Sequence, residues 1–172
     1  MIPKPNEQAY FERIRQHVTT LYDYLSTHAV PIEDDAEAWF EFIAGIRDIQ
    51  GNISNDQSFL ATMLVKRYLM SRFSLADFDA AEKAQGAPGL DIDALTDRGE
   101  RIVGEIKTTV PYGKNDLGAQ QKTTFRKDFK KLNEANAPHK FFFVTSRRTF
   151  EIMQVRYVHL IPDVQIILLV DR

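Results

Sequence analysis

The stretch GLDIDALTDRGERIVGEIKTT, from Gly89 to Thr109, decides how this chain folds. Apolar and polar residues alternate in both of its halves, and the turn residues DRG separate the halves, which is typical of a β-hairpin. A three-residue loop of this kind needs a left-handed residue, and Gly99 suits that position. The expected strands carry four residues with acid–base or metal-binding chemistry: Asp91, Asp93, Glu105 and Lys107.

The register of this hairpin determines whether the carboxylates meet. Residue numbers of directly opposed positions in an antiparallel pair have a constant sum, so the loop DRG places Thr96 opposite Glu100. The same register places Asp91 opposite Glu105, with Asp93 as a diagonal neighbour on the same face. A slip of one residue would move the two acids to opposite faces of the sheet.

Carboxylates held this close repel each other unless a cation lies between them, and Mg²⁺ takes oxygen ligands while keeping several waters. Lys107 is two residues from Glu105 on the same face, where an ammonium could hold a water or steady a phosphate. These are the parts needed to hydrolyse a phosphodiester. E-x-K alone is weak evidence, because the same pattern is common on solvated surfaces. The acids one hairpin turn earlier and the basic helix that follows favour the catalytic interpretation.

The segment PGLDIDALTDRGERIVGEIKTT resembles the active-site hairpin of the PD-(D/E)XK nuclease superfamily, which includes many restriction endonucleases. Either Asp91 or Asp93 matches the first acid, Glu105 matches the second acid, and Lys107 matches the lysine. Pro88 lies three residues before Asp91 instead of directly before the first acid, so two candidates stay open. We favour Asp91, which the register places opposite Glu105, and keep Asp93 as the alternative or as an auxiliary ligand.

The resemblance implies a Mg²⁺-dependent endonuclease that hydrolyses the DNA backbone, as a type II restriction endonuclease or a restriction-like nuclease, with Mn²⁺ able to substitute. The first acid and Glu105 would bind the metal with the carbonyl of Ile106, and Lys107 would position the attacking water. Cleavage would leave a 5′-phosphate and a 3′-hydroxyl. Some relatives carry a glutamine in the following helix that helps to fix the site, and Gln121 matches it. The alternative is a non-catalytic DNA-binding or scaffolding subunit with the same fold, and RNA or branched DNA would require the same chemistry.

The elements around the hairpin predict an α/β fold. The first ~75 residues read as amphipathic helices. Asn6 is expected to cap the first helix, Asp34 or Asp35 to cap the second, and Gly51 to end the second. We therefore expect a helical annex at 1–53, serving as a cap or in dimerisation.

The remaining residues predict three strands, a helix, a strand, a helix and a strand. The last two strands are continuous apolar runs, as expected inside a mixed sheet with helices on both faces. Together with the resemblance, this order predicts a restriction-endonuclease-like mixed β-sheet core flanked by helices at 54–172. The elements expected outside the hairpin are a strand at 75–81, a helix at 117–136, a strand at 139–146, a helix at 147–160 and a strand at 164–170.

The net charge of −2 conceals an asymmetry. Residues 1–97 hold 8 Lys and Arg against 16 Asp and Glu, whereas residues 98–172 hold 14 against 8. A basic half suits a polyanion, although charge also fluctuates along any chain. A basic stripe on the helix after the hairpin, with one more lysine in the preceding loop, predicts contacts to double-stranded DNA; a solvated amphipathic helix is the alternative. The candidates are Lys122, Arg126 and Lys130, widened by Lys127 and Lys131, together with Lys114.

Partners and location follow from simpler features. There are no cysteines, which excludes disulfides and thiolate metal sites. The start, MIPKPNEQAYFERI, has no apolar signal region and no stretch is long and apolar enough for a membrane span, so we expect a cytoplasmic protein that does not bind membranes. The apolar stripe from Phe11 to Leu25 suits packing on the second helix or on a second copy of the chain. A symmetric homodimer would allow two sites to cut both strands of a palindromic target.

Overall fold

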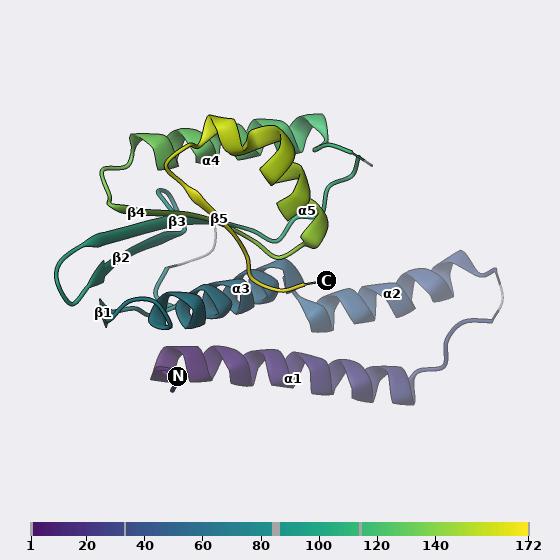
Figure 1. Cartoon of the computed structure of the whole chain (residues 1–172). Helices are drawn as coiled ribbons and strands as arrows, with labels where there is room; N and C mark the ends of the chain where they lie inside the picture. Colours follow the sequence, from purple (N-terminus) through teal and green to yellow (C-terminus); the bar gives the residue numbers. More distant parts are fainter. Residues whose placement is uncertain (1, 33, 84–86, 114, 172) are drawn as a thin grey trace. The chain divides into compact units, whose positions relative to one another are not determined.

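A computed structural model describes residues 2–32, 34–83, 87–113 and 115–171 (Figure 1). The chain divides into two compact units, Met1–Asp56 and Gln57–Arg172. Within the described ranges, no helix combines the length and apolar character needed to cross a membrane.

The first helix, α1, spans Pro5–Thr27 and begins earlier than expected. Lys4 is its N-cap residue, and Pro5 occupies the first helical position, where its missing N–H leaves no hydrogen bond unmade. The carboxylate of Glu7 accepts a hydrogen bond of 2.8 Å from the backbone N–H of Lys4. The predicted cap at Asn6 is therefore wrong, because Asn6 already lies within the first turn.

The second helix, α2, spans Ala36–Gln50 and has the predicted ends. The side chain of Asp35 accepts hydrogen bonds from the backbone N–H groups of Glu37 and Ala38 at 3.0 and 3.4 Å. Gly51 follows the last turn with a φ of +54°, a conformation that suits glycine. Of the two predicted caps, Asp34 and Asp35, the residue that caps α2 is therefore Asp35.

Within the first unit, α1 and α2 lie side by side (Figure 1). The hydroxyl of Tyr24 donates a hydrogen bond of 3.2 Å to the carbonyl of Phe42, and the two rings lie 5.7 Å apart. Val18 and Leu25, which belong to the predicted apolar stripe, are 63% and 47% exposed. Packing between the two helices therefore leaves part of the stripe uncovered by α2.

The later elements follow the predicted order, with differences at their ends. The first strand is shorter than predicted, and the predicted helix at 147–160 changes to a π-helix at Met153–Tyr157 and a 3₁₀-helix at Val158–Leu160. The elements are α3 (Ile53–Met70), β1 (Leu75–Asp77), β2 (Ile92–Thr96), β3 (Arg101–Lys107), α4 (Ala119–Glu134), β4 (His139–Val144), α5 (Arg147–Ile152) and β5 (Gln165–Leu168).

The five strands form one mixed sheet in the order β1-β2-β3-β4-β5. The strands β1, β2 and β3 pair antiparallel, whereas β3, β4 and β5 pair parallel. Figure 1 shows α4 and α5 over one face of the sheet and α3 along the other. The prediction of an α/β fold with a mixed sheet flanked by helices is confirmed.

The core explains why β4 is a continuous apolar run. Phe141 and Phe143 pack with Val65 and Leu69 of α3, whereas Phe142 packs with the apolar face of α4. Successive residues of a strand point to opposite faces, so a strand with helices on both sides has no solvated face.

Gly104 allows β3 to approach its neighbour β4 closely. A Cβ atom at this position would lie 3.0 Å from the ring of Phe143 and 3.3 Å from the carbonyl oxygen of Phe141. Only a residue without a Cβ atom therefore fits at the position that precedes Glu105 in β3 without a shift of its neighbours.

Candidate active site

The hairpin has the register expected from its loop. Ile92 pairs with Gly104 and Asp93 pairs with Val103, so the same register continued by one residue sets Asp91 opposite Glu105. The loop closes through a hydrogen bond of 2.9 Å from the Gly99 N–H to the carbonyl of Thr96, and Gly99 has a φ of +80°. An odd-length loop thus brings both acids to one face of the sheet.

The two opposed acids differ in their burial, and each affects the other's surroundings. Glu105 is only 1% exposed, and burial, together with the neighbouring carboxylate of Asp91, raises the pKa of Glu105 to about 8. Asp91 is exposed, and its Oδ2 atom accepts a hydrogen bond of 2.8 Å from the backbone N–H of Ile106. Because Asp91 is bonded to the backbone of β3, its carboxylate is fixed beside Glu105.

Lys107 lies on β3 with Glu105, and its ammonium forms an ion pair with a residue of α4. Its Nζ atom lies 2.7 Å from Oδ2 of Asp128, and the two side chains are 13% and 6% exposed. The Lys107 ammonium also lies 5.8 Å from the centre of the Phe125 ring. The buried ion pair therefore fixes the position of the lysine, since an unpaired charge there would be costly.

Lys131 lies at the acid pair and not on the outward basic stripe in which the sequence placed it. Its Nζ atom is 3.0 Å from Oε1 of Glu105, 3.2 Å from Oδ1 of Asp128 and 3.1 Å from the carbonyl oxygen of Gly89. This ammonium bridges the hairpin and α4, and its hydrogen bond partly opposes the rise in the pKa of Glu105.

Sequence reasoning missed Asp128 as a site residue. The buried positions of α4 include Gln121, Phe125, Asp128 and Leu132, which recur at helical spacing. A charged residue on the apolar face of an amphipathic helix needs a partner, and this signal was available in the sequence.

Asp93, the alternative first acid, is paired elsewhere. Its two carboxylate oxygens lie 2.8 Å from Nε and 2.6 Å from Nη2 of Arg101, in a bidentate geometry. Hydrogen bonding to Arg101 lowers the pKa of Asp93 below its usual value. With 52% of its side chain exposed, Asp93 is a charge-balanced residue on the outer part of the hairpin.

Gln121 is buried and bonds to the backbone of the loop before α4. Its Oε1 atom accepts hydrogen bonds from the N–H groups of Gly118 and Tyr112 at 2.9 and 3.3 Å, and its Nε2 atom donates to the carbonyl of Val110 at 2.9 Å. These contacts tie Val110, Tyr112 and Gly118 to the first turn of α4. Gln121 therefore supports the backbone that leads into α4.

Lys122 also contributes to the structure of this region. Its Nζ atom lies 2.6 Å from a carboxylate oxygen of Asp116, whose other oxygen accepts a hydrogen bond of 2.6 Å from the hydroxyl of Tyr157. Hydrogen bonds from Lys122 and Tyr157 lower the pKa of Asp116 to about 2. The charge of Lys122, a candidate for phosphate contact, is therefore partly neutralised by Asp116.

The other candidates for DNA contact differ in their surroundings. Arg126 and Lys127 are exposed on α4, and Lys130 is exposed with its Nζ atom 3.7 Å from Glu134. Lys114 lies outside the described residues. The outer surface of α4 therefore presents Arg126 and Lys127 to solvent.

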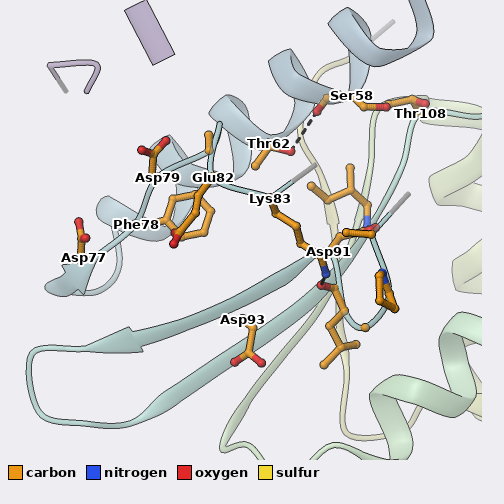
Figure 2. Close-up of a pocket in the computed structure, with 16 residues that line it drawn as sticks. Ser58, Thr62, Asp77, Phe78, Asp79, Glu82, Lys83, Asp91, Asp93 and Thr108 are labelled. Atoms are coloured by element: carbon orange, nitrogen blue, oxygen red, sulfur yellow. Dashed lines mark hydrogen bonds between the residues drawn. The ribbon is translucent and has the colours of Figure 1, made fainter. Parts of the chain in front are cut away.

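A cavity of about 530 Å³ borders Asp91 on the side of α3 and the segment after β1 (Figure 2). Figure 2 shows Lys83 extending toward the start of β2, where its ammonium donates a hydrogen bond to the carbonyl of Leu90. The other charged residues of the lining are all acidic, so the cavity suits a cation better than the phosphate backbone of DNA. Its acidic lining residues are Asp77, Asp79, Glu82, Asp91 and Asp93.

In the part of the chain that the structure describes, no three His, Cys, Asp or Glu side chains gather closely enough to hold a metal ion. A site built on Asp91 and Glu105 would therefore need waters or substrate oxygens to complete its ligand shell, which is the usual way that Mg²⁺ is bound.

No family model matches the chain, and neither a curated protein nor a solved structure matches it significantly. The functional interpretation therefore depends on the geometry of the hairpin and α4.

Proposed function

We propose that this chain is a metal-dependent DNA endonuclease with a site of the PD-(D/E)XK type on a restriction-endonuclease-like core. The observation that carries the proposal is the position of Asp91 opposite Glu105, close enough to help raise the pKa of Glu105 to about 8. Two carboxylates that resist joint ionisation are well suited to a divalent cation, which would stabilise both charges.

Asp91 and Glu105 are the residues that would hold Mg²⁺ or Mn²⁺, with the carbonyl of Ile106 as a further ligand. Their hard oxygen atoms fit these ions, and the bond from the Ile106 N–H keeps Asp91 in place. A bound divalent ion would supply Lewis-acid stabilisation of a phosphoryl oxygen and lower the pKa of a coordinated water. Asp91 is preferred to Asp93 as the first acid, because Arg101 already neutralises Asp93.

Lys107 would steady the attacking water or a phosphate oxygen. Its ammonium is already positioned by Asp128, so little further ordering is needed when the substrate arrives. Attack in line on phosphorus would leave a 5′-phosphate and a 3′-hydroxyl, as in the nucleases that the hairpin resembles.

The proposed substrate is double-stranded DNA, and the proposed setting is a type II restriction or restriction-like activity in the cytoplasm, carried out by a homodimer. Arg126 and Lys127 lie exposed on α4, the helix that also contributes Asp128 to the site, and could contact the phosphate backbone beside it. A homodimer would supply a second site for the other strand.

A second candidate is a non-catalytic DNA-binding or scaffolding subunit. The observation that favours it is the internal pairing of the site: Lys107 with Asp128, and Lys131 with Glu105. A cluster in which these charges have partners within the chain could serve stability alone.

Plasmid cleavage in Mg²⁺ distinguishes the two candidates. We expect nicking or linearisation by the wild type, and a loss of about 10²-fold or more in Asp91→Asn, Glu105→Gln and Lys107→Ala. Asp93→Asn is the matched control, since it removes a carboxylate two residues away on the same strand, and it should retain activity within about threefold. DNA binding without cleavage in Mg²⁺ and Mn²⁺ would support the subunit, and equal loss in Asp93→Asn would overturn the choice of first acid.

A further inference from the structure

Lys131 has a position that the proposed reaction does not explain. Its ammonium contacts three oxygen atoms, from Glu105, Asp128 and Gly89, at 3.0–3.2 Å. A carboxylate pair with a backbone carbonyl is the kind of oxygen environment that also receives a metal ion. The side chain of Lys131 is 42% exposed, whereas that of the adjacent Lys130 is 76% exposed and lies 3.7 Å from Glu134.

The charges around Glu105 show what Lys131 compensates. Asp91 lies opposite Glu105 in the hairpin, and Lys131 contacts Asp128 as well as Glu105, so two further carboxylates lie around Glu105 and raise its pKa. The ammonium of Lys107 is 2.7 Å from Asp128. Among the described residues, the cationic side chain in contact with Glu105 is Lys131, so this lysine would balance the charge of Glu105 when that carboxyl group ionises.

We propose that Lys131 is an internal counter-cation of the acid pair, which a divalent metal ion has to displace or outcompete. The proposal rests on the proposed function in one respect, because it takes Asp91 and Glu105 as the metal-binding pair. It adds that α4 sets the metal affinity: a positive charge 3.0 Å from a ligand oxygen of Glu105 opposes the arrival of a second positive charge. The site would thus bind metal only weakly as long as the ammonium of Lys131 stays in contact with Glu105.

Isothermal titration calorimetry of the full chain with MgCl₂ and MnCl₂ tests this without DNA. Lys131→Met should tighten metal binding roughly tenfold or more, because it removes the competing charge. Lys130→Met is the matched control: it removes the same charge from the next residue and should leave the affinity within about twofold. Lys131→Arg keeps the charge and should bind metal no more tightly than the wild type.

The outcomes separate this proposal from the proposed function. If Glu105→Gln loses metal binding while Lys131→Met binds metal no more tightly than the wild type, the role of Lys131 is overturned and the metal-binding pair stands. If Glu105→Gln binds metal as the wild type does, the metal site itself is overturned, and this proposal with it. Tighter binding in both Lys131→Met and Lys130→Met would mean a general charge effect and would also overturn the role of Lys131.

A measurement on the wild type covers the case in which Lys131→Met fails to fold. The Cε–Hε resonance of Lys131, assigned by its loss in Lys131→Arg, should shift on addition of MgCl₂ and saturate together with the calorimetric signal. The resonance of Lys130 should stay in place. Metal binding that leaves the Lys131 resonance unchanged would overturn the proposal.

Discussion

Replacement of Glu105 by glutamine should change how the stability of the protein depends on pH. The pKa of Glu105 is raised from an ordinary value of 4.5 to about 8, first by burial and then by Asp91. Between these two pH values the folded protein holds a proton that the unfolded chain has released. Unfolding therefore releases a proton, and the free energy of unfolding falls as the pH rises through this window.

The size of the effect follows from the shift. A difference of one pKa unit corresponds to about 1.4 kcal/mol, so the full shift sets an upper limit of about 5 kcal/mol between pH 4.5 and pH 8. Water that reaches the ionised carboxylate reduces this amount. We expect the free energy of unfolding of the wild type to fall by about 1–3 kcal/mol more than that of Glu105→Gln over this range.

Urea unfolding at pH 5, 6, 7 and 8, followed by circular dichroism, measures this difference. Fluorescence of Trp39, the single tryptophan of the chain, reports separately on the unit Met1–Asp56. Glu134→Gln removes an exposed carboxylate from α4 and should keep the pH dependence of the wild type. Equal pH dependence in Glu105→Gln and the wild type would contradict a raised pKa of Glu105, because it would mean that Glu105 ionises normally in the folded protein.

Two further predictions concern the fold and the DNA surface. Gly104→Ala should lower the free energy of unfolding by about 1–3 kcal/mol, because the added methyl group meets the ring of Phe143; an unchanged urea midpoint would contradict the close approach of the strands. Arg126→Ala combined with Lys127→Ala should weaken DNA binding at every sequence tested and reduce the slope of log K against log salt by about 2. Arg98→Ala, in the turn at the far end of the hairpin, should leave that slope unchanged, and equal effects from both changes would argue against a contact surface on α4.

Local chemistry in the sequence was sufficient to predict the order of the later helices and strands and the register of the hairpin. The loop DRG has an odd length, and only a residue that tolerates a positive φ fits the position of Gly99, so the opposition of Asp91 and Glu105 was predictable. Apolar runs with no polar face indicated strands covered on both sides, as β4 is. The start of α1 was predicted wrongly, because residues other than Asn6 can also begin the helix. Here Pro5 takes the first helical position, and Glu7 accepts a hydrogen bond from the N–H of Lys4.

The pairing of charges within the site was decided by tertiary structure. The position of α4 against β3 brings Asp128 to Lys107. It also directs Lys131 toward Glu105, although sequence periodicity placed Lys131 on an outward stripe. A pattern along one chain segment specifies which residues share a face, but not which residue of another segment lies opposite. A long lysine side chain can reach partners several ångströms apart, so its partner depends on which groups lie nearby in the folded protein. Because Glu105 is buried, a contact with the Lys131 ammonium is favourable.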